Sequence, residues 1–416
     1  MSTGANGTIL MYTPSADGGM AQYAWELMSA LARQQPRGAY RIEMVSGADL
    51  QEQFRSDEYE VSAVLPPLRH RSEYSNRLSW VAGRLMHYPR RERRFLKWLE
   101  GRPDVAAVHF QEWTPWLAGA VIRRIRASGR RVFHTVHNVV PHRYPACVPK
   151  AIVNGWIRRA CRACDGLFVH TEALGERLSS VLGEGHPPIH VVPHGVWTVR
   201  DAARIPALDE RLKWRRLLFF GSIRRNKGLD LLLAAMERLS GYSLTIAGEA
   251  HEREYFRSSV LPAVTRLRQA GVQVELLDRF TPEEEVPALF ARHGAVMLPY
   301  TQGFVAQSGV IFMALAHEIP VVASEAGGMR ELFAQFRVGE TFAQETPAAL
   351  AEAVSRLHAG GSGAGLIEQI RAAKRRFSWD QAARATLAGY DKVMDAVATQ
   401  GRRQTDDRAV EATVAF

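Results

Sequence analysis

Short apolar runs alternate with longer amphipathic stretches along almost the whole chain of 416 residues. Such alternation is typical of strands in a parallel sheet whose two faces are covered by helices. The expected strands are Thr8–Tyr12, Tyr40–Val45, Ala106–Phe110, Arg131–Val136, Gly166–Val169, Ile189–Val192, Arg216–Phe220, Ser243–Ala247, Val272–Leu277, Ala295–Pro299 and Pro320–Ala323. The pattern predicts an α/β protein with two doubly wound, Rossmann-like parallel-sheet domains. Ligands are expected at the carboxyl ends of the strands and in the cleft between the domains.

The length is sufficient for two domains with separate cores. The linker is expected at Val199–Asp209, which contains a proline and has no apolar period. We therefore predict an N-terminal domain over residues 1–200, a C-terminal domain over residues 206–378, and a last helix over residues 379–397 that packs toward the N-terminal domain. Residues 399–416 are polar and charged without apolar periodicity, so a disordered tail is expected.

The formal net charge of +10 indicates an anionic partner: a nucleotide sugar, an acidic membrane surface or a nucleic acid. No nucleic-acid recognition module or aromatic stacking platform is visible, so nucleic acid is not expected. The sequence contains no signal peptide and no long apolar segment, which predicts a soluble cytoplasmic protein. Three cysteines do not indicate a disulfide framework. The pair Cys161 and Cys164 lacks a second pair of ligands, so neither a metal nor a cofactor is expected.

A basic run extends from Arg69 to Arg102 and contains ten Lys or Arg residues against three Glu, interleaved with apolar and aromatic residues. Such a stretch suits the surface of an anionic membrane or an anionic acceptor. The alternative is an ordinary solvated helix face. If the first interpretation holds, the protein is peripheral at the inner face of the membrane.

The segment Phe219–Gly228 carries the clearest chemical signal. It leads from an apolar strand through Gly221 and Ser222 into a cationic turn with Arg224 and Lys227, and then into a helix. Free amide groups and cations gathered at one point favour the binding of a diphosphate. A second helix start follows the strand Ala295–Pro299. The residues expected to bind the donor there are Gln307, Ser308, Gly309 and Val310.

Two further glycine turns carry weaker signals. Gly18 and Gly19 follow the first strand and precede a helix, where a ligand can approach the backbone closely. Gly327 and Gly328 follow the strand Pro320–Ala323, and Glu331 there accepts ribose hydroxyls or complements the helix dipole. The alternative for each pair of glycines is a simple tight turn.

Histidines cluster where the fourth expected strand ends. His137 lies at its carboxyl end and is a candidate for contact with a sugar hydroxyl or with charge near an anomeric carbon, whereas His134 is expected in the core. Asn138, His142 and His194 are candidates for the acceptor side or for supporting residues. His142 is equally suited to the surface, and a proline-containing turn explains the segment around His194 nearly as well.

Taken together, these motifs resemble the retaining glycosyltransferases of family 4, whose GT-B architecture consists of two facing Rossmann-like domains. The resemblance extends from about Thr8 to Ala396. It implies that Gly18 and Gly19 approach the donor, that His137 lies near the reacting centre, and that Lys227 binds phosphate. It also implies retention of anomeric configuration.

The chain departs from the family pattern at three positions. Ser222 stands where many members have arginine, so Arg224 is the expected substitute. Val305 and Met313 stand where members commonly have two glutamates that contact the donor sugar and the ribose. Either other groups such as Gln302 or Glu331 replace these glutamates, or the site binds nucleotides without catalysis. We expect an active branch.

The sequence therefore predicts a metal-independent glycosyltransferase of the hexosyltransferase type. It would move a sugar from a nucleoside-diphosphate sugar to a hydroxyl of a glycan, lipid-linked or small-molecule glycoside acceptor in polysaccharide biosynthesis. The alternatives are a nucleotide-sugar epimerase or hydrolase of the same architecture and a non-catalytic, nucleotide-sugar-binding partner subunit.

Overall fold

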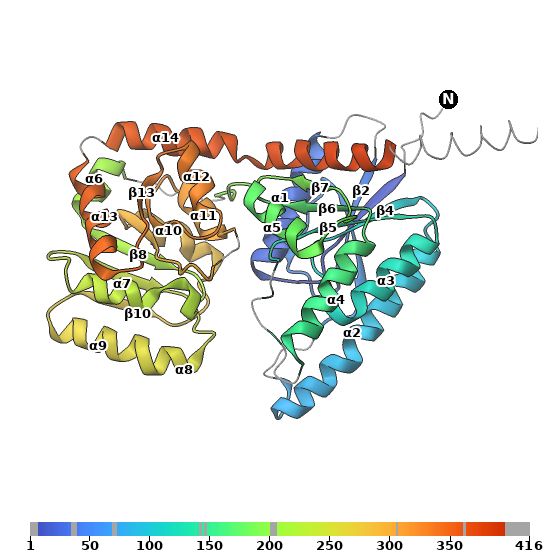
Figure 1. Ribbon diagram of the computed structural model, residues 1–416, viewed down its shortest axis with the longest axis horizontal. Coiled ribbons are helices and arrows are strands. Elements are labelled where there is room, and N and C mark those ends of the chain that lie inside the picture. The colour runs from blue at the N-terminus through green and yellow to red at the C-terminus, as the bar shows by residue number, and fades with distance from the viewer. Residues whose placement is uncertain are drawn as a thin grey trace, which may run out of the picture. The chain divides into compact units, whose positions relative to one another are not determined.

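The computed structural model describes residues 7–34, 40–68, 73–139, 141, 144, 148–199, 206–304, 307–360 and 363–395. The chain divides into two compact units, the first comprising Met1–Pro193 with Trp379–Phe416 and the second comprising His194–Ser378. Each unit is built on one parallel β-sheet with helices on both faces (Figure 1). The predicted architecture of two Rossmann-like domains is confirmed.

The sheet of the first unit has seven strands in the order β3-β2-β1-β4-β5-β6-β7. Its strands are β1 Thr8–Tyr12, β2 Arg41–Gly47, β3 Glu60–Leu65, β4 Val105–Phe110, β5 Arg131–Thr135, β6 Gly166–Val169 and β7 Ile189–Val191. Its helices are α1 Gly18–Gln34, the short η1 Glu52–Phe54, α2 Arg77–Glu100, α3 Pro115–Ala127, α4 Lys150–Ala163, α5 Glu172–Leu182 and a last helix over residues 379–395. The chain reverses direction across the sheet between β1 and β4.

The sheet of the second unit has six strands in the order β10-β9-β8-β11-β12-β13. Its strands are β8 Arg216–Phe220, β9 Ser243–Ala247, β10 Val274–Leu277, β11 Ala295–Leu298, β12 Val321–Ser324 and β13 Gly339–Phe342. Its helices are α6 Leu208–Lys213, η3 Arg225–Lys227, α7 Leu229–Met236, α8 Arg253–Tyr255, η4 Phe256–Val260, α9 Leu261–Gln269, η5 Glu283–Glu285, α10 Val286–Ala291, α11 Gly309–Ala316, α12 Met329–Gln335, α13 Pro347–Ala359 and α14 Gly363–Arg376. The reversal in this sheet lies between β8 and β11.

Every expected strand is present, with ends that move by no more than two residues. Central strands such as β1 and β6 are buried along their whole length, which is why their apolar runs are visible in the sequence. Two strands were missed, β3 and β13, and both lie at a sheet edge. Their side chains are only partly buried, so neither strand shows a continuous apolar run.

The division between the units differs from the predicted boundary at residue 200. Residues 194–199 belong to the second unit, because Trp197 Nε1 donates a hydrogen bond to Gly309 O at 2.8 Å and the His194 ring stacks on Phe312. The last helix belongs to the first unit. Its buried Tyr390 hydroxyl lies 2.5 Å from His109 Nδ1, in the middle of the seven-stranded sheet.

Gly339 at the start of β13 provides a test of the second sheet. Its φ is +150°, and a Cβ there would lie 1.9 Å from Val321 O in β12. We expect Gly339→Ala to lower the free energy of unfolding by at least about 2 kcal/mol, because backbone must move to admit the methyl group. Chemical denaturation measures the change. Gly271→Ala is the control, since its φ is +84° but its Cβ would meet open space. Equal losses for the two variants would contradict the close approach of β12 and β13.

Candidate active site

The turn after β8 is pressed against the end of β11. Gly228 adopts the left-handed conformation with φ +64°, and a Cβ on it would lie 1.8 Å from Pro299 O, so no other residue fits without a shift of the backbone. Thr301 N donates to Asn226 O at 3.2 Å and ties the two loops together. The carboxyl ends of β8 and β11 therefore form one surface, at the point where the chain reverses across this sheet.

Lys227 lies in this surface as a half-buried cation. Its Nζ is 3.7 Å from the centroid of the Tyr300 ring and 4.2 Å from that of Phe304, the geometry of a cation–π contact. Burial among these groups and, to a smaller extent, the nearby Arg224 guanidinium lower the pKa of Lys227 to about 7. In the described part of the chain no carboxylate lies within ion-pair distance of Nζ. Among the described residues the Lys227 ammonium therefore has no carboxylate counter-charge.

The first turn of α11 lies beside this lysine. The Tyr300 hydroxyl is 3.0 Å from Ser308 Oγ, and Ser308 is the residue at which α11 begins. Val310 Cγ2 lies 3.4 Å from the position that a Cβ on Gly221 would take, so α11 starts directly against the β8 turn. Gln307 contributes a buried Oε1 that finds no hydrogen-bond partner among the described residues. The predicted residues Gly221, Lys227 and Gln307–Val310 are thus brought together.

The loop after β12 reaches the same edge of the sheet. Ser324 Oγ donates to Tyr300 O at 2.5 Å, which joins the ends of β11 and β12. Gly327, with φ +57°, and Gly328 follow this serine and precede α12, which carries the half-buried Glu331. Arg225, in contrast, stacks on the Tyr255 ring at 4.8 Å. Of the two arginines in the predicted cationic turn, Arg224 is the one whose charge acts on Lys227.

The first unit has a corresponding surface where β1 and β4 end. Gly18 and Gly19 begin α1, and a Cβ on either would meet open space. In the loop before them Ser15 Oγ donates to the Glu112 carboxylate, which follows β4. Burial raises the pKa of Glu112. The glycine loop is therefore fixed to the end of β4 through a carboxylate that the sequence had not singled out.

His137 follows β5 and is held on both sides. Its Nδ1 lies 3.0 Å from His170 Nε2, and its Nε2 lies 3.1 Å from Gln111 Oε1. His170 Nδ1 contacts Val192 O at 3.1 Å, and burial lowers the pKa of His170 to about 4, so this ring is neutral and donates to the carbonyl. It must then accept the Nδ1 proton of His137. The two contacts fix the orientation of the His137 ring.

The other candidates of this region have different surroundings. His134 packs in the core, with Nδ1 2.8 Å from Phe110 O and its ring stacked on Trp113, and burial lowers its pKa to about 3. Asn138 has a buried Oδ1 without a hydrogen-bond partner in the described ranges. His142 lies outside the described residues. His194 is buried between Phe312 and Trp197 within the second unit, a packing role that needs no ligand.

Not every residue of the basic run is exposed, so the expected membrane-binding or solvated surface is wrong for Arg91 and Glu92. Arg91 is only 2% exposed, and its Nη2 donates to Pro14 O in the glycine loop at 2.9 Å. Glu92 is also buried and accepts the Tyr12 hydroxyl at 3.1 Å, and burial raises its pKa to about 7. Arg91 and Glu92 are buried because they lie one helical turn before Phe95, on the face of α2 that packs against the core. Arg90, Arg93, Arg94 and Lys97 remain exposed.

The site residues that the sequence did not predict have the same place relative to a strand. Tyr300, Gln111 and His170 each come shortly after a strand ends. In parallel sheets these positions line the ligand-binding edge, so the polar residues that follow each expected strand were the available signal. Glu112 and Ser15 follow the same rule.

The fold and the site together define a glycosyltransferase of the GT-B architecture. Residues 17–200 match the family described as "Glycosyltransferase Family 4", and residues 215–359 match "Glycosyl transferases group 1". A D-inositol 3-phosphate glycosyltransferase from Xylanimonas cellulosilytica is 30% identical over 314 residues, which cover 70% of this chain and 72% of that protein. A glycogen synthase from Mycobacterium tuberculosis is 28% identical over 74% of this chain and 72% of its own. The chain belongs to glycosyltransferase family 4.

Solved structures agree with this fold. Sucrose-phosphate synthase from Thermosynechococcus elongatus has a TM-score of 0.69 at 19% identity, covering 94% of this chain and 100% of that one. HepE from Anabaena, in complex with UDP and glucose, has a TM-score of 0.67 at 16% identity, covering 93% and 100%. In the described ranges no helix has the length and hydropathy needed to span a bilayer.

The lowered pKa of Lys227 makes nucleotide binding depend on pH. Pairing with phosphate must raise a pKa that is about 7 in the free protein, so binding takes up a proton near neutral pH. Below pH 7 the lysine is already charged. As pH rises above this value, protonation must accompany binding, and affinity falls. We expect UDP to bind more weakly at pH 8 than at pH 6, as measured by titration calorimetry in buffers of different ionisation enthalpy.

The control is Lys227→Met. Protonation of the UDP phosphates contributes equally to binding by both proteins. The difference in proton uptake between the two proteins isolates the lysine. Identical proton uptake in both would show that Lys227 does not pair with the phosphates.

Proposed function

We propose that this chain is a retaining, metal-independent hexosyltransferase. It takes a sugar from a nucleoside-diphosphate sugar and passes it to a hydroxyl of a glycan, lipid-linked or small-molecule glycoside acceptor, in polysaccharide biosynthesis. The observation that carries the proposal is the unpaired Lys227 ammonium, which lies over Tyr300 and Phe304 where β8 and β11 end. A diphosphate supplies the counter-charge that this lysine lacks.

The chemistry follows from the charge that develops when the bond at the anomeric carbon breaks. Negative charge then accumulates on the departing diphosphate. In our proposal Lys227 and Arg224 stabilise it together with the amides at the start of α11, more strongly in the transition state than in the ground state. Because side chains supply the positive charge, the reaction needs no metal ion. Retention is what family membership implies for the stereochemistry.

The first unit is proposed to bind the acceptor and to contact the sugar of the donor. Gly18 and Gly19 leave open space for a sugar, and His137 has an orientation fixed by His170 and Gln111. An oriented imidazole suits a hydrogen bond to a donor-sugar hydroxyl. Asn138 and the Glu112 carboxylate offer acceptor oxygens near the same strand ends. His142 and His194 stay candidates without further support.

Two alternatives stay open. An epimerase or hydrolase of the same architecture uses the same diphosphate site but needs no acceptor, so product analysis separates it from a transferase. A non-catalytic partner subunit would bind the nucleotide and turn over no donor. The retained cationic turn and glycine loop favour catalysis.

The proposed location is the cytoplasm, at the inner face of an anionic membrane. On α2 the exposed Arg90, Arg93 and Arg94 follow exposed Leu85 and Met86 along one helix. Cations beside exposed apolar side chains are the composition of an interfacial helix. Arg91 is excluded from this surface, because it holds the glycine loop.

Replacing Lys227 by Ala tests the catalytic proposal. We expect kcat to fall by at least about tenfold through lost stabilisation of the leaving group. The donor is first identified by thermal stabilisation across UDP-, GDP- and dTDP-sugars, and turnover is then measured with that donor. Lys213→Ala, an exposed lysine of the same unit, is the matched control. A variant at position 227 with unchanged kcat rules out this role for the lysine.

The membrane part is tested by the triple variant Arg90→Gln, Arg93→Gln, Arg94→Gln. We expect weaker sedimentation with phosphatidylglycerol vesicles, because three charges leave the interfacial side of α2. Nucleotide binding should stay unchanged, since the donor site lies in the other unit. Vesicle binding equal to that of the unaltered protein would remove α2 from the proposed surface.

A further inference from the structure

Helices α3 and α4 pack side by side and carry positive charge without any acidic residue. The α3 sequence PWLAGAVIRRIRA has three arginines, and the α4 sequence KAIVNGWIRRACRA has one lysine and three arginines. Neither contains Asp or Glu. The residues of this cationic pair of helices are not part of the basic run, although α3 also packs against α2.

Ion pairs with neighbouring elements neutralise only part of this charge. Arg124 pairs with Glu100 at 2.7 Å, and Arg126 pairs with Asp165 at 3.1 Å. For Arg123, Arg158 and Arg159 the described part of the chain offers neither an ion pair nor a hydrogen bond. Arg123 Nη1 and Arg159 Cδ both approach the space beside Gly119, at 3.6 and 4.0 Å from the position of a Cβ there. Like charges are therefore gathered in one place.

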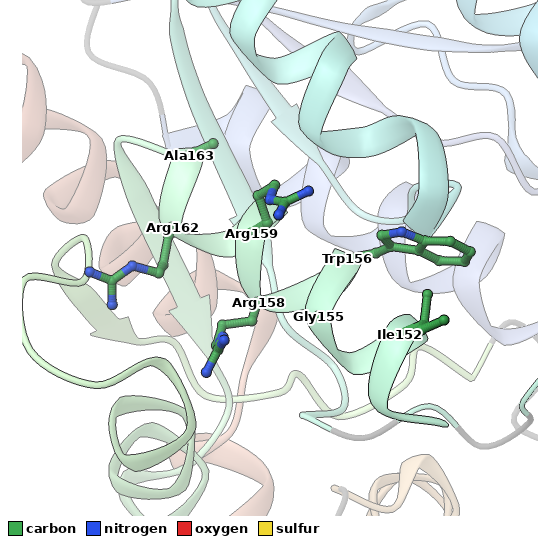
Figure 2. A pocket seen from close by; sticks show the side chains of 7 residues that line it. All are labelled: Ile152, Gly155, Trp156, Arg158, Arg159, Arg162 and Ala163. Atoms are coloured by element: carbon green, nitrogen blue, oxygen red, sulfur yellow. The ribbon is translucent and has the colours of Figure 1, made fainter. Parts of the chain in front are cut away.

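A hollow of about 540 Å³ lies on this side of α4. Gly155 contributes no side chain, and a Cβ on it would meet open space. Figure 2 shows the hollow bordered by Trp156 and Ile152 toward one end and by Arg158, Arg159 and Arg162 toward the other. Arg162 is anchored by a 2.9 Å hydrogen bond from Nη2 to Glu184 O, which leaves its charge uncompensated by any acid there. The hollow thus has a cationic part and an apolar, aromatic part.

The two helices also carry exposed apolar side chains. Ile152 on α4 is 47% exposed and Trp116 on α3 is 38% exposed. Tryptophan and arginine together are typical of the water–membrane interface, where the indole lies at the level of the headgroups and guanidinium groups pair with phosphate. A nucleic acid would compensate the charge equally well but would leave Ile152 and the tryptophans in water.

We propose that the α3–α4 face, formed by Arg123, Arg158, Arg159, Trp116, Trp156 and Ile152, docks on an anionic lipid surface, with a lipid phosphate in the hollow beside Gly155. The inference rests on the proposed membrane partner of the enzyme and adds a surface independent of α2. The repulsion among unpaired arginines is relieved by the phosphates. The apolar side chains enter the headgroup region and leave water.

The test is binding of the full chain to vesicles of equimolar phosphatidylglycerol and phosphatidylcholine. Arg158→Gln with Arg159→Gln should weaken binding by about tenfold or more, since each basic residue near an anionic leaflet strengthens binding by about fivefold. Ile152→Ser, which keeps all charges, should weaken it by about threefold through lost apolar contact. All five positions exchanged here and in the control are exposed, and unchanged melting temperatures verify the folds.

The matched control is Arg257→Gln with Arg266→Gln, two exposed arginines of the second unit without an ion pair in the described ranges. It removes the same net charge. An equal loss of vesicle binding in the control would overturn the proposal, because bulk charge would then explain the effect. Undiminished binding of Arg158→Gln with Arg159→Gln would also overturn it. So would tight binding to duplex DNA that the same pair abolishes while vesicle binding persists.

Thermal stabilisation by UDP, measured on the same samples, separates this inference from the glycosyltransferase proposal. If the vesicle results hold while no nucleotide binds, the α3–α4 face stands and the proposed reaction fails. If UDP binds while Arg158→Gln with Arg159→Gln and the control with Arg257→Gln and Arg266→Gln bind vesicles equally well, the proposed reaction is retained and the α3–α4 face is rejected as a lipid-binding surface.

Discussion

Parallel pairing of every strand is the constraint on which the two sites depend. In such a sheet the carboxyl ends of all strands lie on the same side of the sheet. Where two neighbouring strands continue into helices on opposite faces, their loops diverge and leave room for a ligand. The reversal between β8 and β11 places Lys227 beside Tyr300, and that between β1 and β4 places Ser15 beside Glu112. Residues far apart in sequence become neighbours there without any dedicated binding domain.

The same constraint explains what the sequence could predict. Strands buried on both faces carry apolar runs, and a turn at the end of such a run, like Gly221–Gly228, is recognisable as a binding element. The half-exposed edge strands β3 and β13 carry no such run. Contacts between the loops at the carboxyl ends of the strands could not be predicted from the sequence. The rings that contact Lys227 come from a loop more than seventy residues later in the chain. Arg91 donates to Pro14 from a helix whose sequence is typical of a solvent-exposed helix. Apolar patterns in the sequence predict helices and strands. Predicting which distant side chains meet also requires the register between those strands.

The two positions at which glutamates are common in the family carry Val305 and Met313 in this chain. Met313 is a half-buried residue of α11, and Val305 lies outside the described residues. The buried oxygens Gln307 Oε1 and Asn226 Oδ1 lack hydrogen-bond donors within the described structure. A buried acceptor without a donor costs about 1–3 kcal/mol. Sugar and ribose hydroxyls are donors of the required kind, and in the proposed function these neutral amides and Glu331 are the groups that would recognise them.

The loss of these carboxylates also bears on the electrostatics of Lys227. A glutamate nearby would favour the charged ammonium and raise its pKa. Here burial and Arg224 both act in the opposite direction, and the pKa falls to about 7. The free protein thus limits the cost of an unpaired cation by releasing the proton, while the rings of Tyr300 and Phe304 partly compensate the charge that remains. In the proposed function a diphosphate would supply the negative charge that Lys227 lacks among the described residues, so the donor would complete the electrostatic balance of this site.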